Sequence, residues 1–233
     1  MRRRFFVDEV RNGKATIEGD DARHLTRVLR VEAGQVYEIS DNRQVYLAEI
    51  ATARKEHVEF HVREKLATPA PGIHITLCPA LFKFDHFEWM IEKATELGVS
   101  RIVPVETIRS ERGLRQAAGK RIDRWRKIAL EASQQSRRAF LPEIEEPVSL
   151  TSALAIEAQH RYVLDEECHS GKLESGAQSV AILLGPEGGW TPEERATFGA
   201  WTSVTLGPLI LRAETAAMAA LAIVSQSGWY TGS

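Results

Sequence analysis

The sequence predicts an α/β protein in which a small β-barrel precedes a larger domain with a mostly parallel sheet and helices on both faces. Short strand-like segments with a single helix fill the chain before Ala67. The segment Ala67–Gly72 (ATPAPG) then breaks the chain, because its prolines fit neither a helix interior nor a central strand. Beyond it, strand-like and helix-like segments alternate, as in parallel sheets. We therefore expect one domain over residues 1–67 and a second over residues 73–233.

The first domain contains segments in which apolar and polar residues alternate, which is the pattern of half-buried antiparallel strands. In one of them Val58, Phe60 and Val62 share a face. The expected strands are Arg4–Val7, Lys14–Ile17, Val36–Ser40, Val45–Ala53 and Val58–Lys65.

One helix interrupts these strands. Asp20 or Asp21 can cap it, and Leu25, Val28 and Leu29 follow at helical spacing, so we expect these three side chains on its apolar face.

The second domain is expected to hold five short apolar strands and several amphipathic helices. The strands are Ile73–Leu81, Ile102–Val105, Tyr162–Leu164, Val180–Leu184 and Val204–Leu206. The helices are Asp85–Leu97, Ile122–Gln135, one beginning over Pro192–Phe198, and the small-residue segment Ala213–Trp229. Trp125 shares an apolar helix face with Ile122 and Ile128, so we expect it in the core.

Two glycine- and proline-containing loops follow apolar strands near the end of the chain. They are Leu184–Trp190 (LGPEGGW) and Leu206–Thr215 (LGPLILRAET). Loops at the ends of parallel strands form the floor of a ligand crevice, and glycine lets a ligand approach the backbone. Either loop alone is equally well an ordinary turn. Together they predict a small-molecule site.

Several other kinds of site are disfavoured. The first loop lacks the GK[ST] of a P-loop and the GxGxxG spacing of dinucleotide-binding proteins, and no GxSxG motif is present. The histidines have no HExxH spacing, and Cys78 and Cys168 form no CxxC pair, so we expect neither a metal nor a disulfide. No stretch is apolar for the length of a membrane span, and the N-terminus lacks a signal-peptide core, so we expect a cytoplasmic protein without a membrane partner.

A basic block lies within a chain of net charge −2. Between Arg101 and Leu141, arginines and lysines greatly outnumber acidic residues. Such a block is typical of a surface that contacts nucleic-acid phosphates. The alternative is a solvated helix face with intrahelical salt bridges.

Several motifs together resemble the RsmE family, ribosomal RNA small-subunit methyltransferases of the SPOUT class, and the resemblance extends over nearly the whole chain. In the first domain these are RRFF (Arg3–Phe6) and HLTRVLRVEAG (His24–Gly34). In the second they are ATELGVSRIVPV (Ala94–Val105), SER (Ser110–Arg112), RWRKIALEASQQSRR (Arg124–Arg138), LGPEGG (Leu184–Gly189) and LGPLILRAETA (Leu206–Ala216).

This resemblance implies an enzyme that uses S-adenosylmethionine to methylate ring nitrogen 3 of a uridine in 16S ribosomal RNA. It also implies a PUA-like RNA-binding barrel, a trefoil-knotted catalytic domain, and a homodimer paired through helices beside the cofactor site. The chain departs from the family pattern at Phe84, Leu209 and Ala213.

The resemblance also implies a set of site residues. The cofactor would contact Leu164, Leu184, Gly185, Pro186, Glu187, Gly188, Gly189, Leu206, Gly207, Ile210, Leu211, Arg212, Glu214 and Thr215. RNA would contact Arg4, Arg27, Arg30, Lys83, Arg112, Arg137 and Arg138.

The chemistry suggests catalytic candidates but no base. Uridine nitrogen 3 must lose a proton, and the resulting anion needs stabilisation, for which Arg112 and Arg212 are suited. Glu187 can position a group or accept a proton, or it can simply hold its turn. Two alternatives remain: a SPOUT enzyme for another RNA site, such as a ribose hydroxyl or a transfer-RNA base, and a non-catalytic RNA-binding assembly factor.

Overall fold

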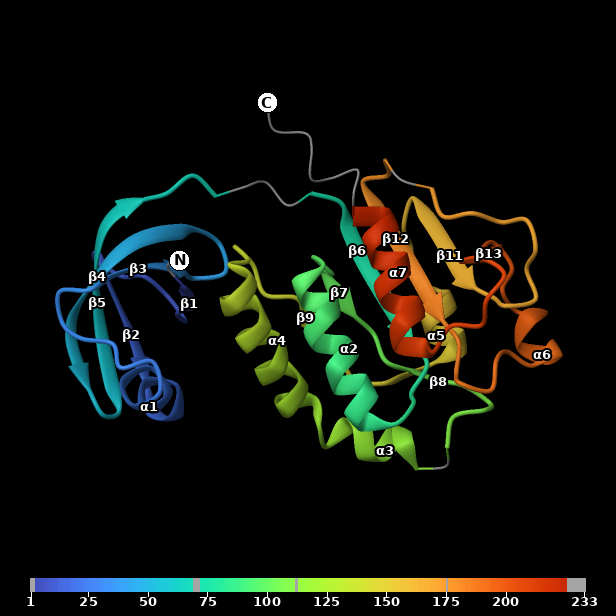
Figure 1. Ribbon diagram of the computed structural model, residues 1–233, viewed down its shortest axis with the longest axis horizontal. Coiled ribbons are helices and arrows are strands. Elements are labelled where there is room, and N and C mark those ends of the chain that lie inside the picture. Colours follow the sequence, from blue (N-terminus) through green and yellow to red (C-terminus); the bar gives the residue numbers. More distant parts are fainter. Residues whose placement is uncertain (1–2, 69–71, 112, 175, 226–233) are drawn as a thin grey trace. The chain divides into compact units, whose positions relative to one another are not determined.

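A computed structural model describes residues 3–68, 72–111, 113–174 and 176–225. The chain forms two compact units (Figure 1). The first consists of Met1–Ala70 together with Ser133–Leu141, and the second of Pro71–Ala132 and Pro142–Ser233. The α/β class expected from the sequence is confirmed, with a curved N-terminal sheet followed by a parallel sheet and helices. The grouping of Ser133–Leu141 with the N-terminal residues has no signal in the sequence pattern.

The first unit is built on a five-stranded sheet in the order β1-β3-β4-β5-β2. The first pair, β1 with β3, is parallel, and the other neighbours are antiparallel. Helix α1 (Gly19–Arg27) packs on the sheet, and the core between them includes Phe5, Leu25 and Phe60. The strands are β1 (Arg4–Phe6), β2 (Lys14–Glu18), β3 (Val36–Ser40), β4 (Val45–Arg54) and β5 (His57–Lys65).

Two details of the α1 expectation are wrong. The helix has Glu18 at its N-cap without a side-chain hydrogen bond, whereas Asp20 and Asp21 lie in the first turn, where the helix dipole favours acidic side chains. The helix ends at Arg27, so Val28 lies past it and is 64% exposed instead of joining the apolar face.

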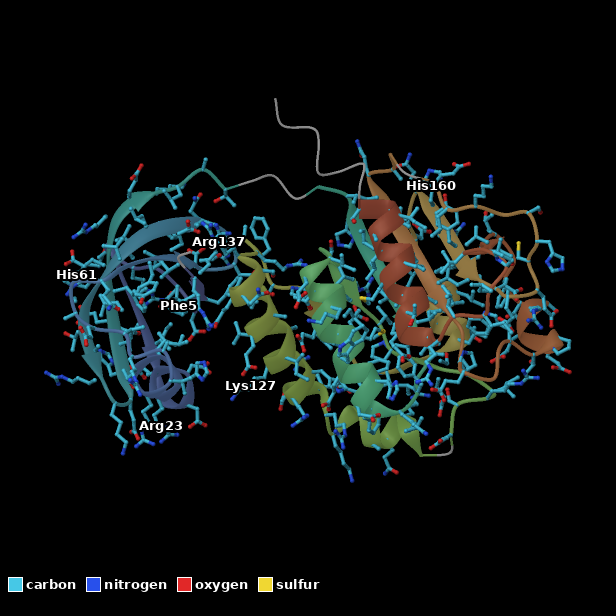
Figure 2. All side chains as sticks on the ribbon, in the orientation of Figure 1. Phe5, Arg23, His61, Lys127, Arg137 and His160 are labelled. Atoms are coloured by element: carbon cyan, nitrogen blue, oxygen red, sulfur yellow. The ribbon has the colours of Figure 1, made fainter. Side chains whose placement is uncertain are left out.

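The segment Ser133–Leu141 is held to the first unit by polar contacts. Glu38 on β3 forms ion pairs with both Arg4 and Arg137, the latter labelled in Figure 2. The Ser40 hydroxyl donates to the Ala139 carbonyl at 2.7 Å, and the Leu141 amide donates to Asn42 Oδ1 at 2.7 Å. These bonds make residues far along the chain part of the N-terminal fold.

We expect Glu38→Gln to destabilise the first unit by about 3 kcal/mol, because it leaves two partly buried arginines without their shared anion. Urea unfolding followed by far-UV circular dichroism measures the loss. All five tryptophans lie outside the first unit, so tryptophan fluorescence reports the second unit separately. The control is Glu49→Gln, which breaks the exposed pair with Arg63 and should cost about 0.5 kcal/mol. Equal effects of the two changes would contradict the prediction.

The second unit contains a six-stranded, fully parallel sheet in the order β13-β11-β12-β6-β7-β9. Its strands are β6 (His74–Pro79), β7 (Arg101–Ile102), β9 (Glu143–Ile144), β11 (His160–Leu164), β12 (Ser179–Leu184) and β13 (Thr202–Val204). A separate parallel pair joins β8 (Val105–Glu106) and β10 (Val148–Ser149). The helices are α2 (Phe84–Glu96), α3 (Leu114–Gly119), α4 (Ile122–Ser136), α5 (Leu150–Leu154), α6 (Pro192–Arg195) and α7 (Ala213–Ser225). The expected helix over Ala213–Trp229 extends beyond the described residues.

Alternate strand residues enter two cores, one on each face of this sheet. Ile182 joins the core formed with α2, α4 and α7, whereas Ala181 and Leu183 join the core that contains Trp190 and Trp201. This is the arrangement expected of a parallel sheet covered on both sides.

Aromatic packing secures helix α4 in the first of these cores. Trp125 is fully buried, as expected, with its ring 4.7 Å from that of Phe87. Phe84, one of the departures from the family pattern, packs edge-on against Trp125, and Arg121 covers its ring.

Three boundaries differ from expectation. The strand expected over Ile102–Val105 is divided into β7 and β8 around Pro104, which has no amide hydrogen to donate. Strand β13 ends at Val204 instead of beginning there. Helix α6 is a single turn, and Gly199 has a left-handed φ of +56° soon after it.

Within the described residues, no helix is long and apolar enough to cross a membrane. The same part of the chain contains no group of three or more histidine, cysteine or acidic residues that could hold a metal ion.

Candidate functional site

The carboxyl ends of four parallel strands meet at one edge of the sheet. The register places Leu164 beside both Leu184 and Val204, and Leu184 beside Pro79. The loops that follow β11, β12, β13 and β6 therefore leave from a common edge. This is the position at which parallel α/β sheets bind ligands.

The loop after β12 is shaped by close contacts that only glycine permits. The Gly189 amide donates to the Pro186 carbonyl at 2.9 Å, and Gly189 has a φ of +73°. A side chain at Gly185 would place its Cβ 2.9 Å from Nε1 of Trp190. That nitrogen donates to the Leu164 carbonyl at 2.9 Å, so Trp190 links this loop to the end of β11.

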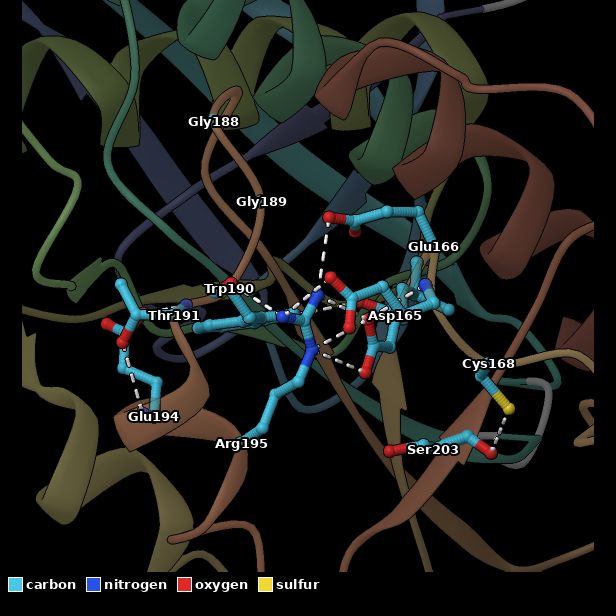
Figure 3. Close-up of polar contacts among 12 residues, drawn as sticks. Asp165, Glu166, Cys168, Gly188, Gly189, Trp190, Thr191, Glu194, Arg195 and Ser203 are labelled. Carbon is cyan, nitrogen blue, oxygen red and sulfur yellow. Dashed lines mark hydrogen bonds and ion pairs between the residues drawn. The ribbon is translucent and has the colours of Figure 1, made fainter.

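An arginine clamps the same two loops together (Figure 3). Arg195, at the end of α6, donates to Asp165 at 3.0 Å and to the Trp190 carbonyl at 2.8 Å. Asp165 is buried, with 7% of its side chain exposed. The hydrogen bond to Asp165 raises the pKa of Arg195. The clamp therefore fixes the first residue after β11 against the last residues of the glycine loop.

A third loop, after β8, is tied to the glycine loop by two side chains. Glu194, which is 3% exposed, accepts from the Ile108 amide at 2.8 Å and from the Thr191 amide at 3.0 Å. Arg109 reaches across and donates to the Gly188 carbonyl. The residues leading to Ser110 and Arg112 therefore begin beside the glycine loop, although Arg112 itself lies outside the described residues.

The loop after β13 has a glycine-dependent bend. Gly207 has a φ of +125°, and its amide donates to the Thr205 hydroxyl at 3.2 Å. Leu206 and Leu211 pack against the core, but Ile210 is 90% exposed, and Leu209 is 77% exposed. An adenine slot lined by Ile210 stays a prediction.

The remaining predicted cofactor and catalytic residues occupy different environments. Glu187 and Arg212 are exposed, and Glu214 is buried in the first turn of α7, where Thr215 is exposed. The strand ends Leu164 and Leu184 are buried. Pro186 is buried in the glycine loop, and Gly188 is exposed. Their roles stay predictions.

The residues predicted to contact RNA separate into two groups. Arg27, Arg30 and Lys83 are exposed. Arg4 and Arg137, in contrast, are paired with Glu38. Arg138 donates to the Phe140 carbonyl, and burial lowers the pKa of Arg138 to about 10.

Much of the basic block is ion-paired within the chain. The pairs are Arg101–Glu145, Arg115–Glu106, Arg121–Glu88, Arg124–Glu88, Arg126–Asp123 and Arg137–Glu38. Of these six pairs, Arg126–Asp123 lies within one helix, whereas the other five join different segments of the chain. The pairs neutralise part of the block without matching the intrahelical alternative, and phosphate contact stays a prediction.

Sequence analysis missed Asp165, Arg195, Glu194 and Arg109. One of them had a readable signal, since Thr191 and Glu194 have the spacing of a capping box, and the structure forms that box at α6. The Asp165–Arg195 and Arg109–Gly188 contacts join residues that are 30 and 79 positions apart, which no local pattern indicates.

Comparisons with known proteins place this geometry in a family. The model of an RNA methyltransferase domain matches residues 68–225, and that of an RNA methyltransferase PUA domain matches residues 17–63. Ribosomal RNA small subunit methyltransferase E of Aquifex aeolicus is 29% identical over 226 residues, covering 94% of this chain and 97% of that protein. The protein of the same name from Bacillus subtilis is 31% identical over 230 residues, covering 90% and 89%.

A solved structure agrees with these relatives. Ribosomal RNA small subunit methyltransferase E from Neisseria gonorrhoeae, bound to S-adenosyl methionine, superimposes with a TM-score of 0.83 at 28% identity, covering 95% of this chain and 96% of that one. The two family models match successive parts of the chain, and the relatives from Aquifex aeolicus and Bacillus subtilis match it over most of their length. The chain therefore belongs to the ribosomal RNA small subunit methyltransferase E family.

Proposed function

We propose that the protein transfers a methyl group from S-adenosylmethionine to ring nitrogen 3 of a uridine in 16S ribosomal RNA. The observation that carries the proposal is the common edge at which three loops, after β11, β12 and β13, are held by glycine-dependent contacts. The names of the relatives and the ligand of the Neisseria structure support the choice of RNA and cofactor.

The residues at this edge suit the cofactor. Gly188 and Gly207 are exposed, and neither has a side chain of its own that would hinder the approach of a ligand to the backbone. Leu206 and Leu211 provide apolar side chains in the loop that contains Gly207. The first turn of α7 offers amide donors for a carboxylate and the carboxylate of Glu214 for an ammonium group. The bound cofactor would supply an electrophilic methyl group on a cationic sulfur leaving group.

The chain's own contribution would be made at the uridine. Nitrogen 3 is a poor nucleophile until its proton is lost, and the charge then spreads onto the neighbouring carbonyl oxygens. We assign the stabilisation of that charge to the exposed Arg212 and to Arg112. Glu187, exposed on the glycine loop, would position the base or accept its proton.

We also propose that the protein works as a homodimer in the cytoplasm, where ribosomal substrate is found. Helix α7 supports this, because its apolar residues are not all covered by its own core: Ile223 is 41% exposed, whereas Leu221 is fully buried. Ile223→Glu is therefore a suitable test of the interface. A change at the fully buried Leu221 would also disturb the core.

The function is tested by incubating the protein with S-adenosylmethionine and small ribosomal subunits from a strain that lacks this methylation. Nucleoside mass spectrometry should then detect 3-methyluridine in 16S RNA. A 2′-O-methylated nucleoside would instead favour a SPOUT enzyme of different specificity, and binding of RNA without methylation would favour an assembly factor.

A further inference from the structure

Two helix N-termini are joined by a histidine–glutamate pair at the edge of the candidate site. His86 lies in the first turn of α2, and Glu214 lies in the first turn of α7. His86 Nδ1 is 2.9 Å from Glu214 Oε1. The two helices pack together, and each follows a loop that leaves the site edge, one after β6 and the other after β13. The pair therefore fixes the start of α7 relative to the start of α2.

One carboxylate oxygen of Glu214 has no hydrogen-bond donor in the described part of the chain. The residue is 9% exposed, and its Oε2 is buried without a hydrogen-bond partner among the described residues. Burial raises the pKa of Glu214, but hydrogen bonds from His86 and from its own backbone amide outweigh that effect, so the pKa lies below its ordinary value. Glu214 is thus an anion at neutral pH, and a buried carboxylate oxygen without a donor is costly. A donor on a bound molecule would remove that cost.

Three charged groups face His86. Glu214 is its hydrogen-bond partner, Asp85 Oδ2 lies 3.7 Å from its Nε2, and Arg212 acts on it from the preceding loop. The hydrogen bond to Glu214 is the largest influence, and together with the two carboxylates it raises the pKa of His86 against the effects of burial and Arg212. His86 therefore remains protonated to a higher pH than an ordinary histidine, and its hold on Glu214 weakens only as the pH rises through that elevated pKa.

We propose that His86 is a positioning residue that holds Glu214 through Oε1, so that Oε2 accepts a hydrogen bond from the ammonium group of the cofactor's amino-acid end. The inference rests on the proposed function and adds to it the residue that orients the cofactor. The amino-acid end is a zwitterion, and the start of α7 complements both charges. The positive end of the helix dipole attracts its carboxylate, and Glu214 attracts its ammonium.

The test is calorimetric binding of two ligands that differ in the amino-acid end. S-Adenosylhomocysteine has this end, and 5′-methylthioadenosine lacks it while keeping the adenosine and the sulfur. The wild-type protein is compared with His86→Gln, which cannot become cationic, and with His86→Lys, which keeps a positive charge. The matched control is His74→Gln, since His74 is exposed at the opposite end of β6.

We expect His86→Gln to weaken S-adenosylhomocysteine binding about tenfold near pH 6, the size of one charge-assisted hydrogen bond. The ratio of the two dissociation constants should fall as the pH rises through the elevated pKa of His86, because the wild-type histidine then loses its charge. His86→Lys should bind more tightly relative to wild type as the pH rises. Binding of 5′-methylthioadenosine should change less than about twofold, which also shows that the site is folded. Dividing the dissociation constant of each variant by that of the wild type at the same pH removes the effect of the ligand's own titration.

Two results would overturn the inference. Equal weakening of both ligands by His86→Gln would mean that the pair only stabilises the fold, and an unchanged affinity for both would remove any role for it. In either case wild-type binding leaves the proposed function standing. If the wild-type protein bound neither ligand, the proposed function itself would fail, and this inference with it.

Discussion

Gly185→Ala is expected to weaken S-adenosylmethionine binding about 10- to 100-fold, the equivalent of an overpacking cost of about 1–3 kcal/mol. The added Cβ would lie 2.9 Å from Nε1 and 3.0 Å from Cε2 of Trp190. The indole is 1% exposed, so it cannot move aside into solvent. Its displacement would break the bond to the Leu164 carbonyl and separate the two loops that Trp190 joins.

Isothermal titration with the cofactor measures this effect. The control is Gly119→Ala at the end of α3, where the φ is not left-handed and the nearest contact is the flexible Glu146 side chain at 3.4 Å. That variant should bind as the wild type does. An unchanged affinity of Gly185→Ala, with the fold intact, would show that the glycine loop does not contact the cofactor.

Removing the clamping arginine should strongly destabilise the second unit. Arg195→Met is expected to lower the free energy of unfolding of the second unit by about 3 kcal/mol, because it leaves the buried Asp165 carboxylate without its cation. The double variant Asp165→Asn/Arg195→Met should be more stable than Arg195→Met alone, since the neutral amide carries a smaller desolvation penalty.

Urea unfolding followed by tryptophan fluorescence measures both variants, because Trp190 and Trp201 lie in the core of this unit. The control is Glu167→Gln, an exposed partner of the same arginine, which should change stability by about 0.5 kcal/mol or less. If the single and double variants were equally unstable, the loss would be due to packing of the arginine stem and not to the unpaired carboxylate.

The parts of the fold that depend on local pattern could be predicted from the sequence. Apolar runs such as Val180–Leu184 identified the parallel strands, and the shared apolar face of Ile122, Trp125 and Ile128 identified α4. The glycine loop after β12 was recognisable for the same reason, since its composition reflects backbone conformations that few other residues adopt.

The contacts that organise the site could not be predicted in this way. No local motif distinguishes His86 from the other histidines, and its partner lies 128 positions away. Arg137 and Arg138 have the same local pattern as the other arginines of the basic block, but Arg137 pairs with Glu38, and Arg138 is partly buried and donates to the Phe140 carbonyl. Charge pairing between distant segments depends on tertiary structure, and composition alone does not distinguish a paired arginine from a free one.

The contribution of Ser133–Leu141 to the first unit has a consequence for biosynthesis. Chains generally fold from the N-terminus as they leave the ribosome, one domain after another. Here the N-terminal sheet lacks the partners of Arg4, Ser40 and Asn42 until residue 141 has been made. By then all of Pro71–Ala132 has been synthesised, so β6, α2, β7, β8 and α3 precede the last segment of the unit that begins the chain. The first unit can therefore be completed only after much of the second unit has been synthesised. The folding of the two units is coupled in time, although each has its own core.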